Sequence, residues 1–460
     1  MSEINAGADW ETDPIVTRTA GEAPSFTMAK PDSVNAEDLA WSALPQVAMM
    51  LLHAPVSADR GAATEVLDRA RAIARAIAPR AGPRLTRVGP VLLVGTSVQT
   101  GRIMASLTEE FTKRHGKPKF IRLRPLGIGA LKSVRQNVRR VESDLAGALS
   151  TANIGEPFGL RDELLKVETF RRRIAKVKFR NAGIRAVIVG SQNNASVRAL
   201  LSVVHHQHVS SYYIPHAPTA DNAFYHDLPT NWALLRGASE VEFYRGLGAT
   251  PLDHLAAVGN PGEPVSHATP PNSSSVVYAA SAPEVIQGDI DVIYHAIRSP
   301  IKVSLHHRMR SHAYRRMFPS AWEIIDAPDT STYLRRHGAK AVVQHGSGVG
   351  LEALSMGLDV IDLCHPQDRP NYPYIIEPYV QIVHDVSSLR KAMDKLSVRA
   401  GGRLERIDYA HSWCNESSID VVRSIADLVE QSSTCDTAGG VLLDGWEWGC
   451  AAKGDFSYPD

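Results

Sequence analysis

The sequence has few cysteines, no long apolar segment and almost no net charge, and each shortage excludes a class of protein. Its cysteines show neither a CxxC motif nor a Cys/His spacing, so neither a zinc site nor a disulfide framework is indicated. No apolar run reaches the roughly 20 residues that cross a bilayer. Because 50 lysines and arginines balance 49 aspartates and glutamates, a nucleic-acid partner is not favoured.

The length and composition are those of a globular protein with more than one domain. A chain of 460 residues is long enough for two or three domains, each with its own core. Hydrophobic residues make up 44% and charged residues 22%, which is ordinary for soluble proteins. The first residues, MSEINAGADWETDPIV, are polar and acidic, unlike a secretory signal. We therefore expect a cytoplasmic protein, with a mobile N-terminal tail at residues 1–35 and a C-terminal tail at residues 432–460.

From residue 89 onward, short β-branched runs alternate with helical segments. This alternation predicts parallel sheets covered by helices on both faces. A segment rich in Pro, Gly and Ser, residues 259–275, is the best domain boundary in the chain. We predict an α/β protein with two Rossmann-like parallel-sheet domains, residues 36–262 and 276–431, joined by a linker at 263–275. Two such domains bind ligands in the cleft that they face.

The glycine-rich stretch at residues 341–366 predicts a strand, a turn, a helix and a second strand. A glycine turn that leads into a helix presents backbone N–H groups, which can bind an anion. His345 ends the first strand, Ser347 lies in the turn, and Glu352 follows one turn into the helix. The glycines are Gly346, Gly348 and Gly350. An anion site with a carboxylate close behind it suits a nucleotide diphosphate, whose ribose hydroxyls the glutamate would bind.

Two basic clusters precede the middle of the chain, at residues 132–140 and 171–185. They could attract an anionic acceptor or bring the protein into peripheral contact with a membrane. The interpretation we favour is that they are solvated faces of helices. The oligomeric state does not follow from the sequence.

Three passages resemble the GT-B glycosyltransferases and the sugar-nucleotide 2-epimerases that share their fold. Residues 345–361, HGSGVGLEALSMGLDVI, are similar to the family's Gly/Ser turn and "EAL..G.PVI" signature. Residues 304–308, SLHHR, resemble a His-Pro motif of bacterial capsule, polysialic-acid and teichoic-acid transferases, with His307 in place of proline. Residues 231–237 and 257–261 resemble the passage that closes the first domain of those enzymes. The likeness covers residues 186–400.

The resemblance implies a donor site in the second domain. The glycine turn with its serine would hold the phosphates, and Glu352 would bind ribose. His306 and Arg308 would face the phosphate or leaving group, where a cation stabilises the charge that develops. Asp368 would contact sugar hydroxyls. The implied donor-binding set is His306, Arg308, His345, Gly346, Ser347, Gly348, Gly350, Glu352 and Asp368.

Transfer to a hydroxyl needs a base, and a histidine suits neutral pH. His216 ends the predicted strand SSYYIP, at a position that resembles the His-Gly histidine of the capsule enzymes, with Ala217 in place of glycine. Asp221 and Asp227 are second choices, as the base or as groups that orient His216. The alternative is that His216 only hydrogen-bonds in its loop. The loops that would line the acceptor side contain Thr96, Gln99 and Asn193.

The sequence therefore predicts a glycosyltransferase that moves a sugar from a nucleotide-sugar donor to a small-molecule or glycan hydroxyl. No metal-ligand spacing is present, and the resemblance implies neither a metal ion nor another cofactor. One alternative is a sugar-nucleotide 2-epimerase, although the chain has no counterpart of that group's "EAGLR" segment. A second alternative is a non-catalytic protein of the same fold that binds nucleotides or sugars.

Overall fold

The structure is a computed structural model, and it describes two parallel-sheet domains but not every segment of the chain. The described residues are 39–40, 42–43, 47, 83–151, 159–192, 194–221, 228–247, 254–261, 273–280, 286–305, 312–327, 329–364, 372–396, 402–415 and 419–434. The predicted N-terminal tail, most of the predicted linker and nearly all of the predicted C-terminal tail lie outside these ranges.

The first domain is built on a seven-stranded sheet with the strand order β3-β1-β2-β4-β5-β6-β7. Its strands are β1 (Arg84–Val88), β2 (Val91–Gly95), β3 (Lys119–Phe120), β4 (Ala186–Val189), β5 (Ser210–Tyr213), β6 (Trp232–Leu235) and β7 (Leu255–Ala257). In the part of the sheet with the order β2-β4-β5-β6-β7, neighbouring strands are parallel, as predicted. The antiparallel strand β1 was not predicted. It joins β2 through Gly89, whose φ of 56° allows a tight turn, and Pro90.

The second domain is built on a six-stranded sheet in which every described pair of neighbouring strands is parallel. The strand order is β10-β9-β8-β11-β12-β13. The strands are β8 (Val276–Ala280), β9 (Ile301–Leu305), β10 (Glu323–Ile324), β11 (Ala341–Gln344), β12 (Val360–Leu363) and β13 (Val380–Val383). The predicted fold class, α/β with two parallel-sheet domains, is thus confirmed.

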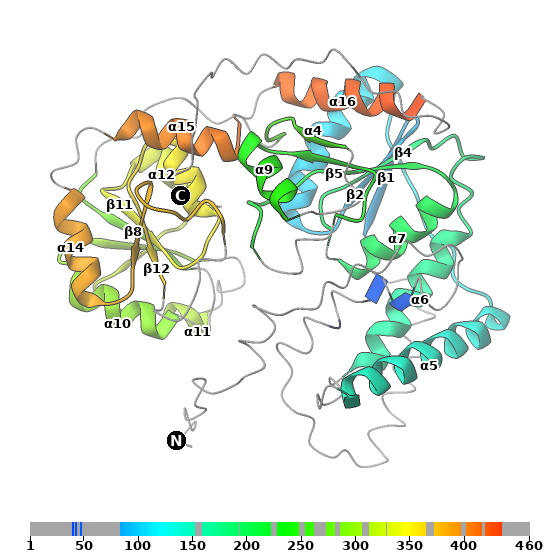
Figure 1. Cartoon of the computed structure of the whole chain (residues 1–460), viewed down its shortest axis with the longest axis horizontal. Coiled ribbons are helices and arrows are strands. Elements are labelled where there is room, and N and C mark those ends of the chain that lie inside the picture. Colours follow the sequence, from blue (N-terminus) through cyan, green and yellow to red (C-terminus); the bar gives the residue numbers. More distant parts are fainter. Residues whose placement is uncertain are drawn as a thin grey trace.

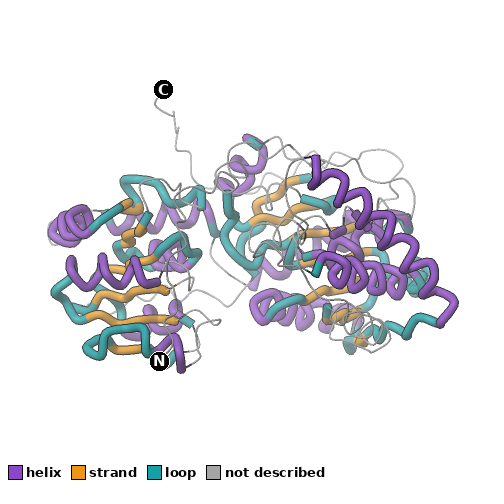
Figure 2. The backbone as a smooth tube through the Cα atoms, turned by 90° about the horizontal axis from the view of Figure 1, so that it is seen from below, coloured by secondary structure: helices purple, strands orange, loops and turns teal. Residues whose placement is uncertain are grey.

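Helices cover both faces of each sheet (Figures 1 and 2). Those of the first domain are α4 (Val98–His115), α5 (Ile128–Thr151), α6 (Leu160–Ala175), α7 (Ala195–His206) and α9 (Ala238–Gly246). Those of the second are α10 (Ile286–Ala296), α11 (His312–Arg315), α12 (Thr330–His337), α13 (Val349–Ser355), α14 (Val386–Leu396) and α15 (Arg403–Trp413). The last helix, α16 (Ile419–Thr434), returns to the first domain and packs beside α4 (Figure 1).

Each sheet has an apolar core on either side, as expected for parallel strands buried on both faces. In the first domain, α4 and α16 close one face, and α5, α6 and α7 close the other. In the second domain, α10 and α14 share one core, whereas α13 and α15 share the other. Arg114 of α4 holds α16 in place through ion pairs to Asp427 at 2.6 Å and Glu430 at 3.1 Å.

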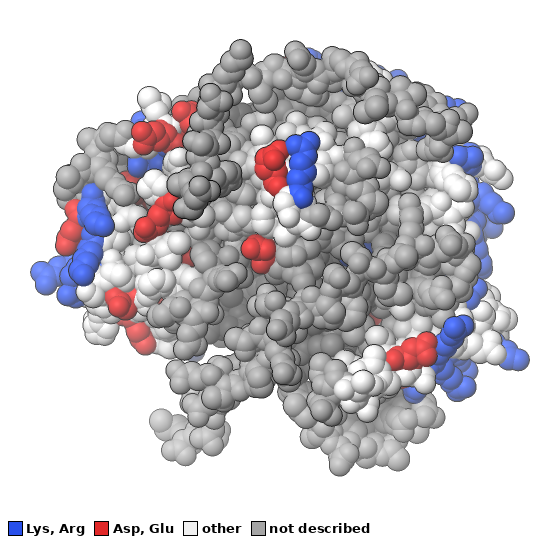
Figure 3. Space-filling view, in the orientation of Figure 1, with Lys and Arg blue, Asp and Glu red and all other residues white. Residues whose placement is uncertain are grey.

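The basic clusters fit the favoured interpretation only in part. On α5, the basic side chains of residues 132–140 are exposed, and Val134 and Val138 are buried beneath them, so this cluster is a solvated helix face. The prediction is wrong for Arg171, which is fully buried with its Nε 2.6 Å from Glu168. A buried arginine requires such a partner, because an unpaired charge in the core is strongly destabilising. Figure 3 shows basic side chains along the right-hand edge of the first domain.

Candidate functional site

The loop after β5 lies directly against the glycine turn after β11, at the junction of the two domains. A Cβ atom placed on Gly348 would lie 2.8 Å from Cδ of Pro218, which belongs to the loop that carries His216. The backbone of Gly348 is helical (φ −66°), so any residue could adopt it. Glycine is therefore required here by the close approach of the two domains. The structure brings together the loop predicted to hold the base and the turn predicted to hold the donor.

Replacing Gly348 with alanine tests this contact. We expect the added methyl group to destabilise the protein by about 1–3 kcal/mol, because it overpacks the junction against Pro218. Urea unfolding measures the change. The double variant Pro218→Ala/Gly348→Ala removes the opposing ring atoms and should recover most of the loss. If Gly348→Ala were as stable as the wild type, the two domains would not be in contact at this point in solution.

His216 is held in one tautomer at the end of β5. Its Nδ1 atom lies 2.6 Å from the Gly190 carbonyl oxygen, which can only accept a hydrogen bond. Nδ1 therefore carries the proton, and Nε2 carries the lone pair. Burial lowers the pKa of His216, the bond to Gly190 opposes this, and the nearby charge of Arg236 lowers it further. The lowered pKa keeps the imidazole neutral at neutral pH, so it can accept a proton. The side chain is only partly buried and therefore remains accessible.

A buried ion pair, Arg236 with Glu240, lies beside His216. Arg236 follows β6 and is 5% exposed, and Glu240 on α9 is fully buried. The carboxylate accepts hydrogen bonds from Arg236 Nη2 at 3.0 Å and Nε at 3.2 Å. Burial alone would lower the pKa of Arg236, but the charge of Glu240 more than offsets this and raises it. Arg236 is therefore a permanent cation. Arg236 lies in residues 231–237, which resemble the family, but the resemblance implied no role for it.

Glu352, on α13, faces the first domain across the junction. Its side chain is exposed to solvent, and desolvation by the groups around its carboxyl raises its pKa to about 7. The charge of Asp329 raises it further, whereas Arg236, Arg335 and Arg102 oppose the rise. Two of these arginines belong to the first domain. Arg102 on α4 also pairs with Asp329, the N-cap of α12, at 3.4 Å, and so links the two domains.

The glycine turn is anchored by a hydrogen bond to the buried carboxylate of Asp362. The Gly346 N–H donates to Asp362 at 3.1 Å, and Gln344 Nε2 donates to the same carboxylate at 2.8 Å. Burial raises the pKa of Asp362 to about 6. The Tyr374 hydroxyl donates to the Ser347 carbonyl oxygen. The Gly346 amide thus bonds within the protein, in contrast to the predicted turn whose N–H groups point outward.

His345 lies on the opposite face of the sheet from its neighbour Gln344. Along β11, Val343 packs with α10 and Val342 with α13, so successive side chains alternate between the two cores. His345 Nδ1 donates to Asp289 Oδ1 on α10 at 2.9 Å, and the Tyr278 hydroxyl donates to Oδ2 at 2.6 Å. His345 and Glu352, both predicted for the donor site, therefore lie on opposite faces of the second sheet, His345 on the α10 side and Glu352 on the α13 side.

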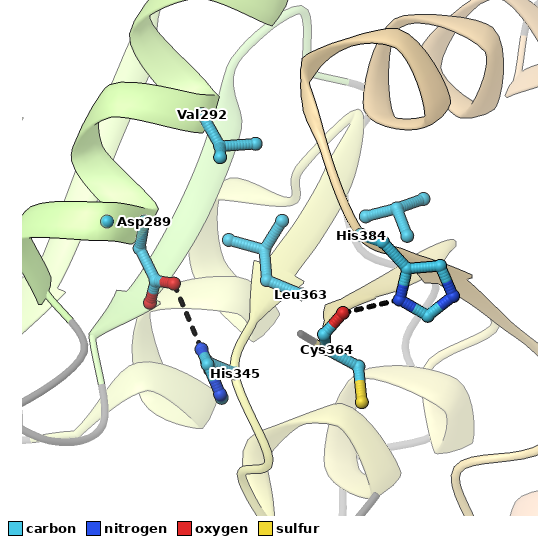
Figure 4. A pocket seen from close by; sticks show the side chains of 8 residues that line it. Asp289, Val292, His345, Leu363, Cys364 and His384 are labelled. Atoms are coloured by element: carbon cyan, nitrogen blue, oxygen red, sulfur yellow. Dashed lines mark hydrogen bonds and ion pairs between the residues drawn. The ribbon is translucent and has the colours of Figure 1, made fainter. Parts of the chain in front are cut away.

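A small pocket opens beside His345 at the carboxyl ends of β11, β12 and β13 (Figure 4). It contains about 220 Å³ of space, solvent included. Its lining residues are Gly288, Asp289, Val292, His345, Leu363, Cys364, Val383 and His384. His384 Nδ1 donates to the Cys364 carbonyl oxygen, as Figure 4 shows. Because this volume includes open solvent, the enclosed space is smaller still, and the pocket does not enclose a nucleotide sugar.

Several predicted site residues cannot be placed. His306, Arg308, Asp368, Asn193 and Asp227 lie outside the described residues, as does the side chain of Gln99.

Two predicted residues near the junction are placed. Asp221 is exposed at the end of the described loop. The Thr96 N–H donates to Thr100 Oγ1 at 2.8 Å, so its backbone helps to begin α4. The described part of the chain holds no group of three His, Cys, Asp or Glu arranged for a metal ion. None of the described helices has both the length and the apolar character needed to span a membrane.

Comparisons with known proteins give matches of structure only. No protein-family model matches the chain, and no curated protein does. A glycosyltransferase from Rickettsia africae has 10% sequence identity and a TM-score of 0.44, over 75% of this chain and 98% of that one. MurG from Acinetobacter baumannii has 8% identity and a TM-score of 0.41, over 74% and 98% of the chains.

A UDP-GlcNAc 2-epimerase from Neisseria meningitidis, in a structure bound to UDP-GlcNAc, is also similar. It has 11% identity and a TM-score of 0.38, over 58% of this chain and 81% of that one. The similar structures thus include glycosyltransferases and a 2-epimerase, the two groups that the sequence motifs resemble.

Proposed function

We propose that this protein is a glycosyltransferase that moves a sugar from a nucleotide-sugar donor to the hydroxyl group of an acceptor. The observation that carries the proposal is the contact between the His216 loop of the first domain and the glycine turn of the second, through Pro218 and Gly348. This contact brings a candidate base from one domain to the candidate donor side of the other. A transfer between two bound substrates needs such an arrangement.

His216 supplies the base in this proposal. Its Nε2 lone pair takes the proton of the acceptor hydroxyl while that oxygen attacks the anomeric carbon of the donor sugar. The bond from the anomeric carbon to the phosphate oxygen breaks, and the nucleotide leaves with the electron pair. The lowered pKa keeps the imidazole neutral, and therefore ready to accept a proton, at pH 7.

The second domain binds the donor in this proposal. Glu352 reaches solvent at the junction and, with a pKa of about 7, can donate or accept a hydrogen bond to a ribose hydroxyl. The permanent charge of Arg236 lies close enough to Glu352 to shift that pKa.

A product assay tests the proposal. A thermal-shift screen with UDP, CDP, CMP, GDP and TDP first identifies the nucleotide, because a ligand that binds the native state raises its melting temperature. The matching nucleotide sugars are then incubated with and without methyl glycosides as acceptors. We expect free nucleotide only when an acceptor is present. Interconversion of the donor sugar without acceptor would instead identify a 2-epimerase, and binding without turnover a non-catalytic protein.

A further inference from the structure

We propose that Glu240 is a positioning residue that places His216 for catalysis. This inference rests on the proposed function, in which His216 is the base. Glu240 is fully buried on α9, where it cannot contact a substrate directly. It acts through the loop that carries His216.

Glu240 joins the ends of two neighbouring strands. Its Oε1 atom accepts from the Thr219 N–H at 3.1 Å, in the loop after β5, and from the Arg236 side chain after β6. Its Oε2 atom accepts from the Arg236 N–H at 2.9 Å. Both carboxylate oxygens are therefore used, and one buried side chain binds both loops.

The position of His216 depends on three contacts from different parts of the fold. Its ring is bonded to the Gly190 carbonyl oxygen after β4. Two residues further along, Pro218 packs against Gly348 of the second domain. The next residue, Thr219, is bonded to Glu240. Only the contact to Thr219 is made by a buried charged side chain, that of Glu240. Removing the charge or the oxygens of Glu240 should therefore release the His216 loop at Thr219.

The same junction also docks the second domain. The Arg236 carbonyl oxygen accepts from the Asn415 N–H at 2.9 Å, after the end of α15. Ser239 on α9 donates to the Ser412 hydroxyl on α15 at 2.9 Å. A Cβ atom on Gly237 would lie 2.3 Å from the Ser412 carbonyl oxygen. Glu240 therefore connects the His216 loop to the point where the two domains meet.

The full-length variant Glu240→Gln tests the proposal. Its amide replaces one of the two acceptor oxygens with a donor, so the backbone N–H of either Thr219 or Arg236 loses its acceptor, and Arg236 loses its counter-charge. We expect turnover to fall about 10²-fold, as for a displacement of about 1 Å in a catalytic group, with donor affinity unchanged. The matched control is Glu242→Gln on the same helix, where Glu242 pairs with Arg245 at the exposed surface and no change is expected.

The tautomer of His216 gives a readout that does not depend on activity. Nitrogen-15 NMR of labelled histidine, assigned with a His216→Asn variant, distinguishes Nδ1–H from Nε2–H. We expect only Nδ1–H in the wild type, where this nitrogen donates to Gly190, and a mixture in Glu240→Gln. If Glu240→Gln does not fold, Arg236→Met/Glu240→Leu removes both buried charges together with the acceptor and should give the same mixture.

The outcomes separate this inference from the proposed function. A mixed tautomer with reduced turnover supports the positioning role. An unchanged Nδ1–H tautomer in the folded variant overturns it, whatever the turnover. If the wild type transfers no sugar, the proposed function fails, but the tautomer of the variant still decides whether Glu240 positions His216.

Discussion

Replacing His216 with asparagine is expected to lower turnover of the nucleotide-sugar donor by about 10²–10⁴-fold, the usual contribution of a general base. The asparagine side-chain amide can still donate to the Gly190 carbonyl oxygen, so the loop should keep its position. It cannot accept a proton. Initial rates at saturating donor and acceptor measure the loss, and donor affinity should not change, because the proposed donor site lies on the second domain.

The pH dependence provides a second measurement on the same variant. The pKa of His216 lies below its ordinary value, so the neutral base persists to a lower pH than for an ordinary histidine. Wild-type turnover should therefore fall only as the pH drops through that lowered pKa, and His216→Asn should lose this acidic limb. The comparison variant is Asp221→Asn, since Asp221 is the other described candidate base. Near-normal turnover in His216→Asn, with a loss in Asp221→Asn, would transfer the role to Asp221.

Replacing Arg236 with alanine is expected to destabilise the folded protein by about 3–5 kcal/mol. The change leaves the Glu240 carboxylate fully buried without its counter-charge. Both oxygens of Glu240 also hold backbone N–H groups, so the side chain cannot turn to solvent without losing these bonds. Urea unfolding, followed by circular dichroism, measures the change in free energy.

Two further variants show whether the buried charge is the cause. Arg236→Met/Glu240→Leu leaves no charge in the core and should recover part of the loss, although two backbone amides lose their acceptor. Arg245→Ala breaks the exposed pair with Glu242 on the same helix and should change stability by no more than about 1 kcal/mol. An equally small effect for Arg236→Ala would show that Glu240 is not buried as a charged group.

Local patterns in the sequence predicted most of the elements that the structure contains. The helices α7 and α12 begin after Asn194 and Asp329, which are N-cap residues of the preferred type, and their side chains bond to the first turn. The β-branched runs at β8, β11 and β12 are the buried strands expected. The strand β1 and the helix α15 were missed, since neither has a regular apolar pattern that distinguishes it from a loop.

The candidate site was predicted in its parts but not in its connections. His216, the glycine turn and Glu352 were identified by residue type and by their place after strands. Arg236 and Glu240 were not. A charged residue directly after a buried strand is a signal that could have found Arg236, whereas Glu240 lies within α9 and has no such signal. His345 was grouped with Glu352 from their proximity in the sequence. Alternation along β11 directs it toward α10 instead.

The sequence by itself determined which segments are strands and helices, because periodicity, caps and glycine turns act between residues a few positions apart. Only the tertiary structure decided which loops meet. Thr219 reaches Glu240 because β5 and β6 are neighbours in the sheet, and Pro218 reaches Gly348 because the two domains dock. Such contacts depend on the whole packed fold, in which residues more than a hundred positions apart share one junction.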